Sequence, residues 1–133
     1  MIFVDSSAWI EFLRGTGSYV CDRVEALIAR DFAVCDVVRM EVLSGARSEN
    51  HLVLLRRLLA RGTLLTTGPV DYETAASLYR HCRMKGETVR RLMDCLIAAV
   101  AMRQGIAVLH QDADFEALAR HTNLMVEEGC TVK

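Results

Sequence analysis

Short apolar runs of strand length alternate along this chain with longer segments whose apolar residues recur at helical spacing. Strands are expected at residues 2–5, 32–37, 64–67, 106–109 and 124–127. Helices are expected at residues 6–14, with Ser6 or Ser7 as the cap, and at 18–30, 38–47, 50–61, 71–85, 93–104 and 113–121. This alternation predicts an α/β fold, a three-layer α/β/α sandwich with a central, mainly parallel sheet of four to five strands.

Length and composition fit one globular domain spanning residues 1–133. The chain is 52% hydrophobic and 25% charged, has a single proline, and contains no linker or internal repeat. No apolar run approaches the roughly 18 residues of a membrane span, and the first five residues lack the basic segment of a secretory signal. Five cysteines without a Cys-x-x-Cys pair indicate reduced thiols rather than a disulfide framework. We therefore expect a cytoplasmic protein.

Four acidic residues lie beside the apolar runs. Asp5 ends the first run, Glu41 follows the second, and Asp94 opens the apolar helical segment that begins at Cys95. Asp112 comes just after residues 106–109. Carboxyl ends of parallel strands meet in one crevice, where clustered carboxylates would repel one another without a cation. Oxygen ligands suit Mg²⁺ or Mn²⁺. Taken singly, each aspartate is better explained as a helix cap, and it is the joint pattern that favours a metal site.

The same edge of the sheet also favours anions. Helix N-termini that point into the crevice suit phosphate groups, and a divalent cation can neutralise charge on phosphate oxygens. Together these features indicate metal-assisted hydrolysis of a phosphodiester. Of the 16 basic residues 14 are arginines, whose planar fork suits phosphate. The basic residues nearest the acids are expected to hold the phosphates, unless they belong to a solvated loop: Arg39, Lys85, Arg90 and Arg91.

Four local sequences resemble, in order, the motifs of PIN domains, specifically the toxin ribonucleases of the VapC family. They are Val-Asp-Ser-Ser-Ala-Trp-Ile at 4–10, Met-Glu-Val-Leu-Ser-Gly at 40–45, Arg-Leu-Met-Asp-Cys-Leu-Ile-Ala-Ala at 91–99 and Leu-His-Gln-Asp-Ala-Asp-Phe at 109–115. The resemblance implies that the four acids form the catalytic, metal-binding quartet. It also implies that Ser6 supports the site and that Asp114 is an accessory acid. His110 departs from the pattern, since the family often has a small hydroxyl residue there.

The resemblance implies a metal-dependent endoribonuclease toxin that uses Mg²⁺ or Mn²⁺. It further implies inhibition by a cognate VapB-like antitoxin, a homodimer, and a heterotetramer or larger assembly with the antitoxin. The alternative is a PIN-like module that binds RNA or acts as a scaffold without catalysis. A phosphotransferase with Asp5 as nucleophile is disfavoured, because that chemistry needs a second acid at position 7, which is serine. A phosphate-binding Gly-x-x-x-x-Gly-Lys loop is absent.

Overall fold

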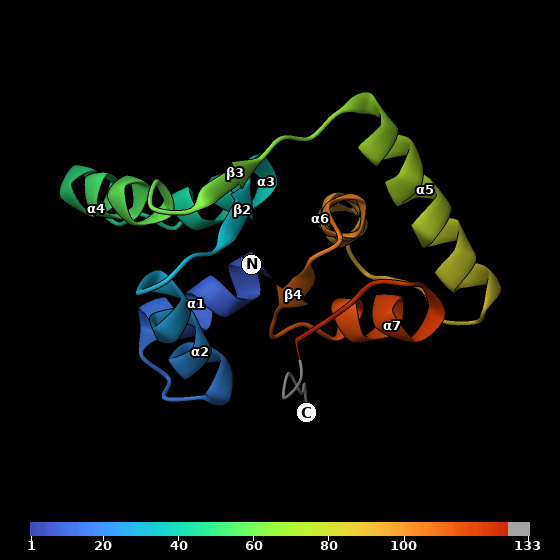
Figure 1. The fold of residues 1–133 in the computed structure, drawn as a ribbon, viewed down its shortest axis with the longest axis horizontal. Helices are drawn as coiled ribbons and strands as arrows, with labels where there is room; N and C mark the ends of the chain where they lie inside the picture. Colours follow the sequence, from blue (N-terminus) through green and yellow to red (C-terminus); the bar gives the residue numbers. More distant parts are fainter. Residues whose placement is uncertain (128–133) are drawn as a thin grey trace.

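The chain folds into alternating strands and helices, as the sequence pattern predicts. A computed structural model describes residues 1–127, and in that range it contains four strands and seven helices (Figure 1). The strands are β1 (Ile2–Val4), β2 (Ala33–Cys35), β3 (Thr63–Leu65) and β4 (Ala107–Leu109). The helices are α1 (Ser6–Arg14), α2 (Tyr19–Ile28), α3 (Asp36–Leu43), α4 (Glu49–Leu59), α5 (Pro69–Met84), α6 (Leu92–Gln104) and α7 (Ala113–His121).

The strand order fixes where a site can form. The four strands pair in parallel in the order β3-β2-β1-β4, so β1 lies between β2 and β4. The chain builds outward from β1 to β3 and then crosses back to place β4 on the other side of β1. This reversal opens a crevice at the carboxyl ends of β1 and β4, the usual place for a ligand in an open α/β sheet. A backbone hydrogen bond from Asp5 to the carbonyl of Leu109 (3.0 Å) ties these two ends together.

Helices cover both faces of the sheet and complete the expected three layers. In Figure 1, α1, α2 and α4 lie on one side of the strands, and α5, α6 and α7 lie on the other. The core includes Trp9, whose ring packs edge-on against Phe32 with centroids 5.1 Å apart. Helix α6 is apolar all round, and its residues from Asp94 to Ala101 are buried. A helix with no polar face is typical of a central position in the core.

Caps at the helix ends explain several of the observed boundaries. The side chains of Asp5, Ser18, Ser48 and Asp112 each accept a backbone N–H in the first turn of the following helix. The first of these differs from the expectation that Ser6 or Ser7 caps α1, because the carboxylate of Asp5 precedes them and takes that position.

Two of the predicted strands differ most from the observed ones. The strand expected at 124–127 is reduced to an isolated parallel bridge between Val126 and Val108, with Glu127 N–H donating to the carbonyl of Val108 (2.9 Å). The strand expected at 32–37 ends at Cys35, because α3 begins at Asp36, an acid that is favourable in the first turn of a helix.

None of the helices within residues 1–127 is both long enough and apolar enough to cross a membrane.

Replacing Gly62 should destabilise the fold. A Cβ at this position would lie 2.2 Å from the buried ring of Phe32, which Trp9 holds in place. We expect Gly62→Ala to lower the free energy of unfolding by about 1–3 kcal/mol, the usual cost of overpacking a core, as measured by urea denaturation. Gly45→Ala is the matched control, since its Cβ would meet only the Val42 carbonyl at 3.5 Å. Equal stability of the two variants would contradict this prediction.

Candidate active site and metal centre

Asp5 stands at the end of the central strand and is almost fully buried. Its Oδ2 accepts the backbone N–H of Ser7 (3.0 Å) and the Ser7 hydroxyl (2.6 Å). Its Oδ1 is buried and has no hydrogen-bond partner among the described residues. Burial is the main reason why the pKa of Asp5 rises to about 6; the hydrogen bonds from Ser7 act against this rise, and the nearby charge of Glu41 adds to it. The carboxylate is therefore held in place by serine yet lacks a counter-charge.

Asp94 lies in the first turn of α6 and is the most strongly perturbed acid. Desolvation is the main reason why its pKa rises to about 9, and hydrogen bonding to Asp114 and the charges of Asp5 and Asp112 add to the effect. Its Oδ2 is buried without a hydrogen-bond partner within residues 1–127. In the metal-free protein Asp94 is thus protonated at neutral pH.

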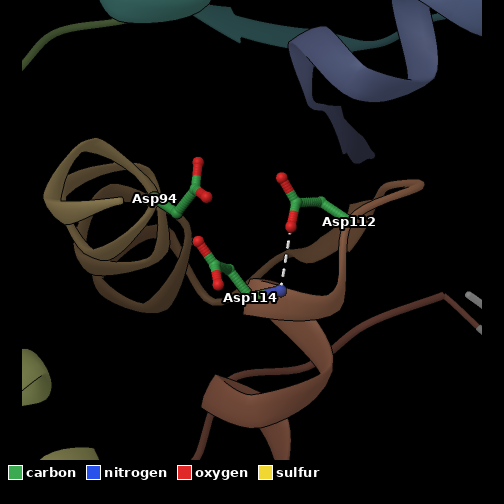
Figure 2. Close-up of side chains that lie close together, drawn as sticks. All are labelled: Asp94, Asp112 and Asp114. Atoms are coloured by element: carbon green, nitrogen blue, oxygen red, sulfur yellow. Dashed lines mark hydrogen bonds between the residues drawn. The ribbon is translucent and has the colours of Figure 1, made fainter. Parts of the chain in front are cut away.

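Three aspartates converge at the start of α7. Carboxylate oxygens of Asp94, Asp112 and Asp114 lie within 4.8 Å of one another, close enough to share one cation. Figure 2 shows Asp94 reaching from α6 toward the two aspartates that flank the first turn of α7. Asp114, expected only as an accessory acid, is therefore a full member of this triad.

Backbone donors hold the α7 aspartates. Asp112 Oδ1 accepts the N–H of Asp114 (2.9 Å), and the two oxygens of Asp114 accept the N–H groups of Arg90 and Arg91 (3.0 Å each). Burial acts to raise the pKa of Asp114, but hydrogen bonds from Asp94 and from these N–H groups outweigh it and lower the pKa. One proton is thereby retained by Asp94 while Asp114 stays ionised.

Glu41 approaches the cluster from α3. Its Oε1 accepts the hydroxyl of Ser6 (3.1 Å), and its Oε2 accepts a short hydrogen bond from Arg91 Nη2. Glu41 lies outside the triad, but its charge acts on Asp5, and the charge of Asp5 acts on Asp94. All four acids selected from the sequence thus belong to one electrostatic group, and Ser6 contacts it as expected.

The four basic residues selected from the sequence separate into two pairs. Arg90 forms ion pairs with Asp112 (2.9 Å) and Asp114 (3.4 Å), and Arg91 pairs with Glu41. Within residues 1–127, no ion pair joins Arg39 or Lys85 to an acid of the site. Arg39 is half-buried on α3, and Lys85 is exposed at the C-terminal end of α5.

Two functional contacts were missed in the sequence. Ser7 donates to Asp5 and also accepts the backbone N–H of Gln111 (2.9 Å), which links the ends of β1 and β4. The buried ring of His110 accepts the N–H of Asp112 at Nδ1 (3.1 Å) and packs against Phe115. Burial lowers the pKa of His110, so the ring is neutral and shapes the turn that carries Asp112. The only sequence signal was their position beside the acids.

The site fits a hard divalent cation. Every side-chain ligand on offer is a carboxylate oxygen, and two of these oxygens, on Asp5 and Asp94, are buried without a partner in the described part of the chain. Both of these carboxyls have raised pKa values, which a bound cation would reverse. Oxygen-only donor sets suit Mg²⁺ or Mn²⁺ better than metals that prefer nitrogen or sulfur.

The fold and the site define an α/β domain with a carboxylate centre at the switch point of a parallel sheet. The family model of the PIN domain matches residues 2–121. Ribonuclease VapC11 of Mycobacterium tuberculosis is 44% identical over 128 residues, which cover 93% of this chain and 96% of that protein. The chain therefore belongs to the PIN-domain family, within the group of VapC ribonucleases.

Solved structures show the same fold at lower identity. VapBC2 from Rickettsia felis, bound to a DNA fragment from its promoter, matches with a TM-score of 0.75 and 19% identity, covering 96% of this chain and 98% of that one. A toxin–antitoxin complex from Klebsiella pneumoniae matches with a TM-score of 0.69 and 19% identity, covering 86% and 90% of the two chains. The expected three-layer fold is confirmed.

The metal-free protein should lose stability as the pH rises. Asp94 and Asp5 have folded-state pKa values of about 9 and about 6, above the ordinary value of 3.8, so the folded state retains protons that the unfolded chain releases. Between pH 5 and 8 we expect wild type to lose about 1–3 kcal/mol more unfolding free energy than Asp94→Asn, measured by urea denaturation in EDTA.

The matched control is Asp31→Asn, an exposed loop acid. Its pH profile should run parallel to that of wild type. A parallel profile for Asp94→Asn as well would show that Asp94 is not the group that retains the proton.

Proposed function

We propose that this protein is a metal-dependent endoribonuclease toxin, which hydrolyses RNA phosphodiester bonds through its carboxylate centre. The observation that carries the proposal is the convergence of Asp94, Asp112 and Asp114, next to buried carboxylate oxygens that lack a partner within residues 1–127. The relative with 44% identity is named a ribonuclease, which supports RNA as the substrate class.

The proposed metal ligands are Asp5, Glu41, Asp94 and Asp112. Asp114 is proposed as a further ligand, because it lies in the triad with Asp94 and Asp112. When bound there, Mg²⁺ or Mn²⁺ would lower the pKa of water and neutralise charge on the phosphate oxygens. Asp94 must give up its proton for binding, and a carboxylate of this group is then suited to orient the attacking water.

The surrounding residues orient the acids and hold the substrate. Ser6 fixes Glu41, and Ser7 fixes Asp5, so each carboxylate presents a defined oxygen toward the crevice. Arg90 and Arg91 lie at the mouth with exposed side chains, where their guanidinium groups suit phosphates on either side of the scissile bond. Arg39 and Lys85 are proposed to extend this contact along the RNA.

An antitoxin is the proposed partner, in line with the toxin–antitoxin complexes among the structures of the same fold. A groove of about 570 Å³ runs between α1, α3 and α4, with Ile10, Leu13 and Leu55 among its lining residues. Glu41 lies on its wall, so a segment bound in the groove would reach the carboxylate centre. Residues of both α1 and α4 line this groove.

The proposal also includes the oligomeric state of the protein and its location in the cell. We propose a homodimer that forms a heterotetramer or larger assembly with the antitoxin, acting in the cytoplasm. Four buried cysteines in the described part of the chain are free thiols, which supports a reducing compartment. The alternative, a PIN-like module without catalysis, differs from this proposal in the outcome of the cleavage experiment below.

Cleavage of a structured RNA pool should require both the metal and Asp94. We expect cutting in Mg²⁺ or Mn²⁺, none in EDTA, and a rate at least about 100-fold lower for Asp94→Asn, because losing a ligand removes several kcal/mol of transition-state stabilisation. Asp31→Asn should cut like wild type. Equal cutting by wild type and Asp94→Asn would exclude the site, and binding without cutting would favour the non-catalytic module.

Arg90 and Arg91 should contribute to RNA affinity and to its dependence on salt concentration. In the Asp94→Asn background, which keeps the RNA intact, we expect Arg90→Ala combined with Arg91→Ala to weaken binding. The slope of log affinity against log salt should fall by about 1.4, or about 0.7 for each lost phosphate contact. Fluorescence anisotropy over a salt series measures both quantities.

The control removes two exposed arginines of α4, Arg56 and Arg57. A slope change equal to that of the Arg90 and Arg91 variant would assign the effect to net charge rather than to contacts at the site.

A further inference from the structure

The acids of the site divide by whether a guanidinium group contacts them. Arg90 Nη2 donates to Asp112 Oδ1 (2.9 Å), Arg90 Nε donates to Asp114 Oδ1 (3.4 Å), and Arg91 pairs with Glu41. By contrast, Asp5 Oδ1 and Asp94 Oδ2 are buried without a partner in the described part of the chain. The two guanidinium groups therefore contact Asp112, Asp114 and Glu41 directly, whereas neither forms an ion pair with Asp5 or Asp94 within residues 1–127.

The backbone that carries these arginines is fixed independently of their side chains. Both N–H groups donate to the buried carboxylate of Asp114 (3.0 Å each), and the preceding residue, Val89, is 1% exposed. The side chains themselves are 69% exposed for Arg90 and 47% for Arg91. Each guanidinium group can therefore leave the acids by rotamer change without any movement of the loop between α5 and α6.

The ion pairs are not needed to hold the fold. Solvent-exposed pairs contribute little to stability, and the loop is already anchored by Asp114 and by the burial of Val89. The ion pairs instead occupy carboxylate oxygens that a cation would need as ligands. Asp112 Oδ1 already accepts the N–H of Asp114, so the contact from Arg90 fills the remaining acceptor capacity of that oxygen.

We propose that Arg90 and Arg91 compete with the divalent cation for these carboxylates, so that the chain's own guanidinium groups restrain metal binding. This inference rests on the proposed metal site. A cation at the triad would compete with Arg90 for Asp112, and a cation at Glu41 would compete with Arg91, because two positive charges on one carboxylate repel each other. The arginines thus lower metal affinity even though they raise affinity for phosphate.

The test is the affinity of the RNA-free protein for Mn²⁺, measured by isothermal titration calorimetry. We expect Arg91→Ala and Arg90→Ala each to bind Mn²⁺ about 3- to 10-fold more tightly than wild type, the range expected when a partly exposed ion pair no longer competes. Arg39→Ala is the matched charge control on the helix that carries Glu41, and it should change the affinity by less than about 2-fold. Circular dichroism verifies that each variant is folded.

A double-mutant cycle locates the effect. In the Glu41→Gln background, Arg91→Ala should change Mn²⁺ affinity by less than about 2-fold, because the carboxylate that it competes for is gone. An unchanged or weaker affinity for Arg91→Ala and Arg90→Ala, with wild type still binding, would overturn this inference alone. So would an equal gain for Arg39→Ala, or a full gain in the Glu41→Gln background. Failure of wild type and every variant to bind Mn²⁺ would overturn the proposed metal site and, with it, this inference.

Discussion

Repulsion between converging carboxylates is the constraint on which the arrangement of this site depends. The fold offsets it in three ways. A proton held by Asp94 removes one charge, backbone N–H groups stabilise the charge on Asp114, and guanidinium groups cover Asp112 and Glu41. None of these reaches the buried oxygen of Asp5, within the part of the chain described. The negative charge at the centre of the site is therefore the least neutralised, and a cation would be bound most favourably there.

The strand order creates this convergence. Placing β1 beside β4 brings the ends of two parallel strands together, and each strand is followed by an aspartate that caps the next helix. Helix caps point their carboxylates toward N–H groups and positive dipole ends, which favours the ionised form. Asp94 is not a cap, because it lies within the first turn of α6, where the residues from Asp94 to Ala101 are all buried. Capping and metal binding are thus compatible uses of the same residues. Hydrogen bonds from Ser7 limit the rise in the pKa of Asp5, whereas the hydrogen bond to Asp114 adds to the rise in the pKa of Asp94.

The sequence predicted the four observed strands and the order of the helices, and it singled out four acids that the structure brings near one another, because each depends on local patterns such as an apolar run ending in aspartate. It did not predict that Asp114 joins the triad, that Ser7 links two strands, or that His110 orients Asp112. These contacts depend on how β4 and α7 meet β1, which is a long-range property. The expected strand at 124–127 was wrong for a related reason: a short apolar run indicates a strand, but it does not specify how many of its residues pair with the neighbouring strand β4.

The arginines at the mouth of the site also couple the binding of its two proposed ligands, the divalent cation and RNA. A guanidinium group held by a carboxylate is less available to phosphate, and a carboxylate held by arginine is less available to a cation. Binding of either ligand to the proposed site releases the group that the other requires, so metal and RNA should strengthen each other's binding by the same factor. Glu41 extends this coupling to the groove between α1, α3 and α4, because it contacts Arg91 and also lines that groove. A partner bound there would act on the ion pair between Arg91 and Glu41, which is proposed to restrain metal binding, without contacting the buried acids.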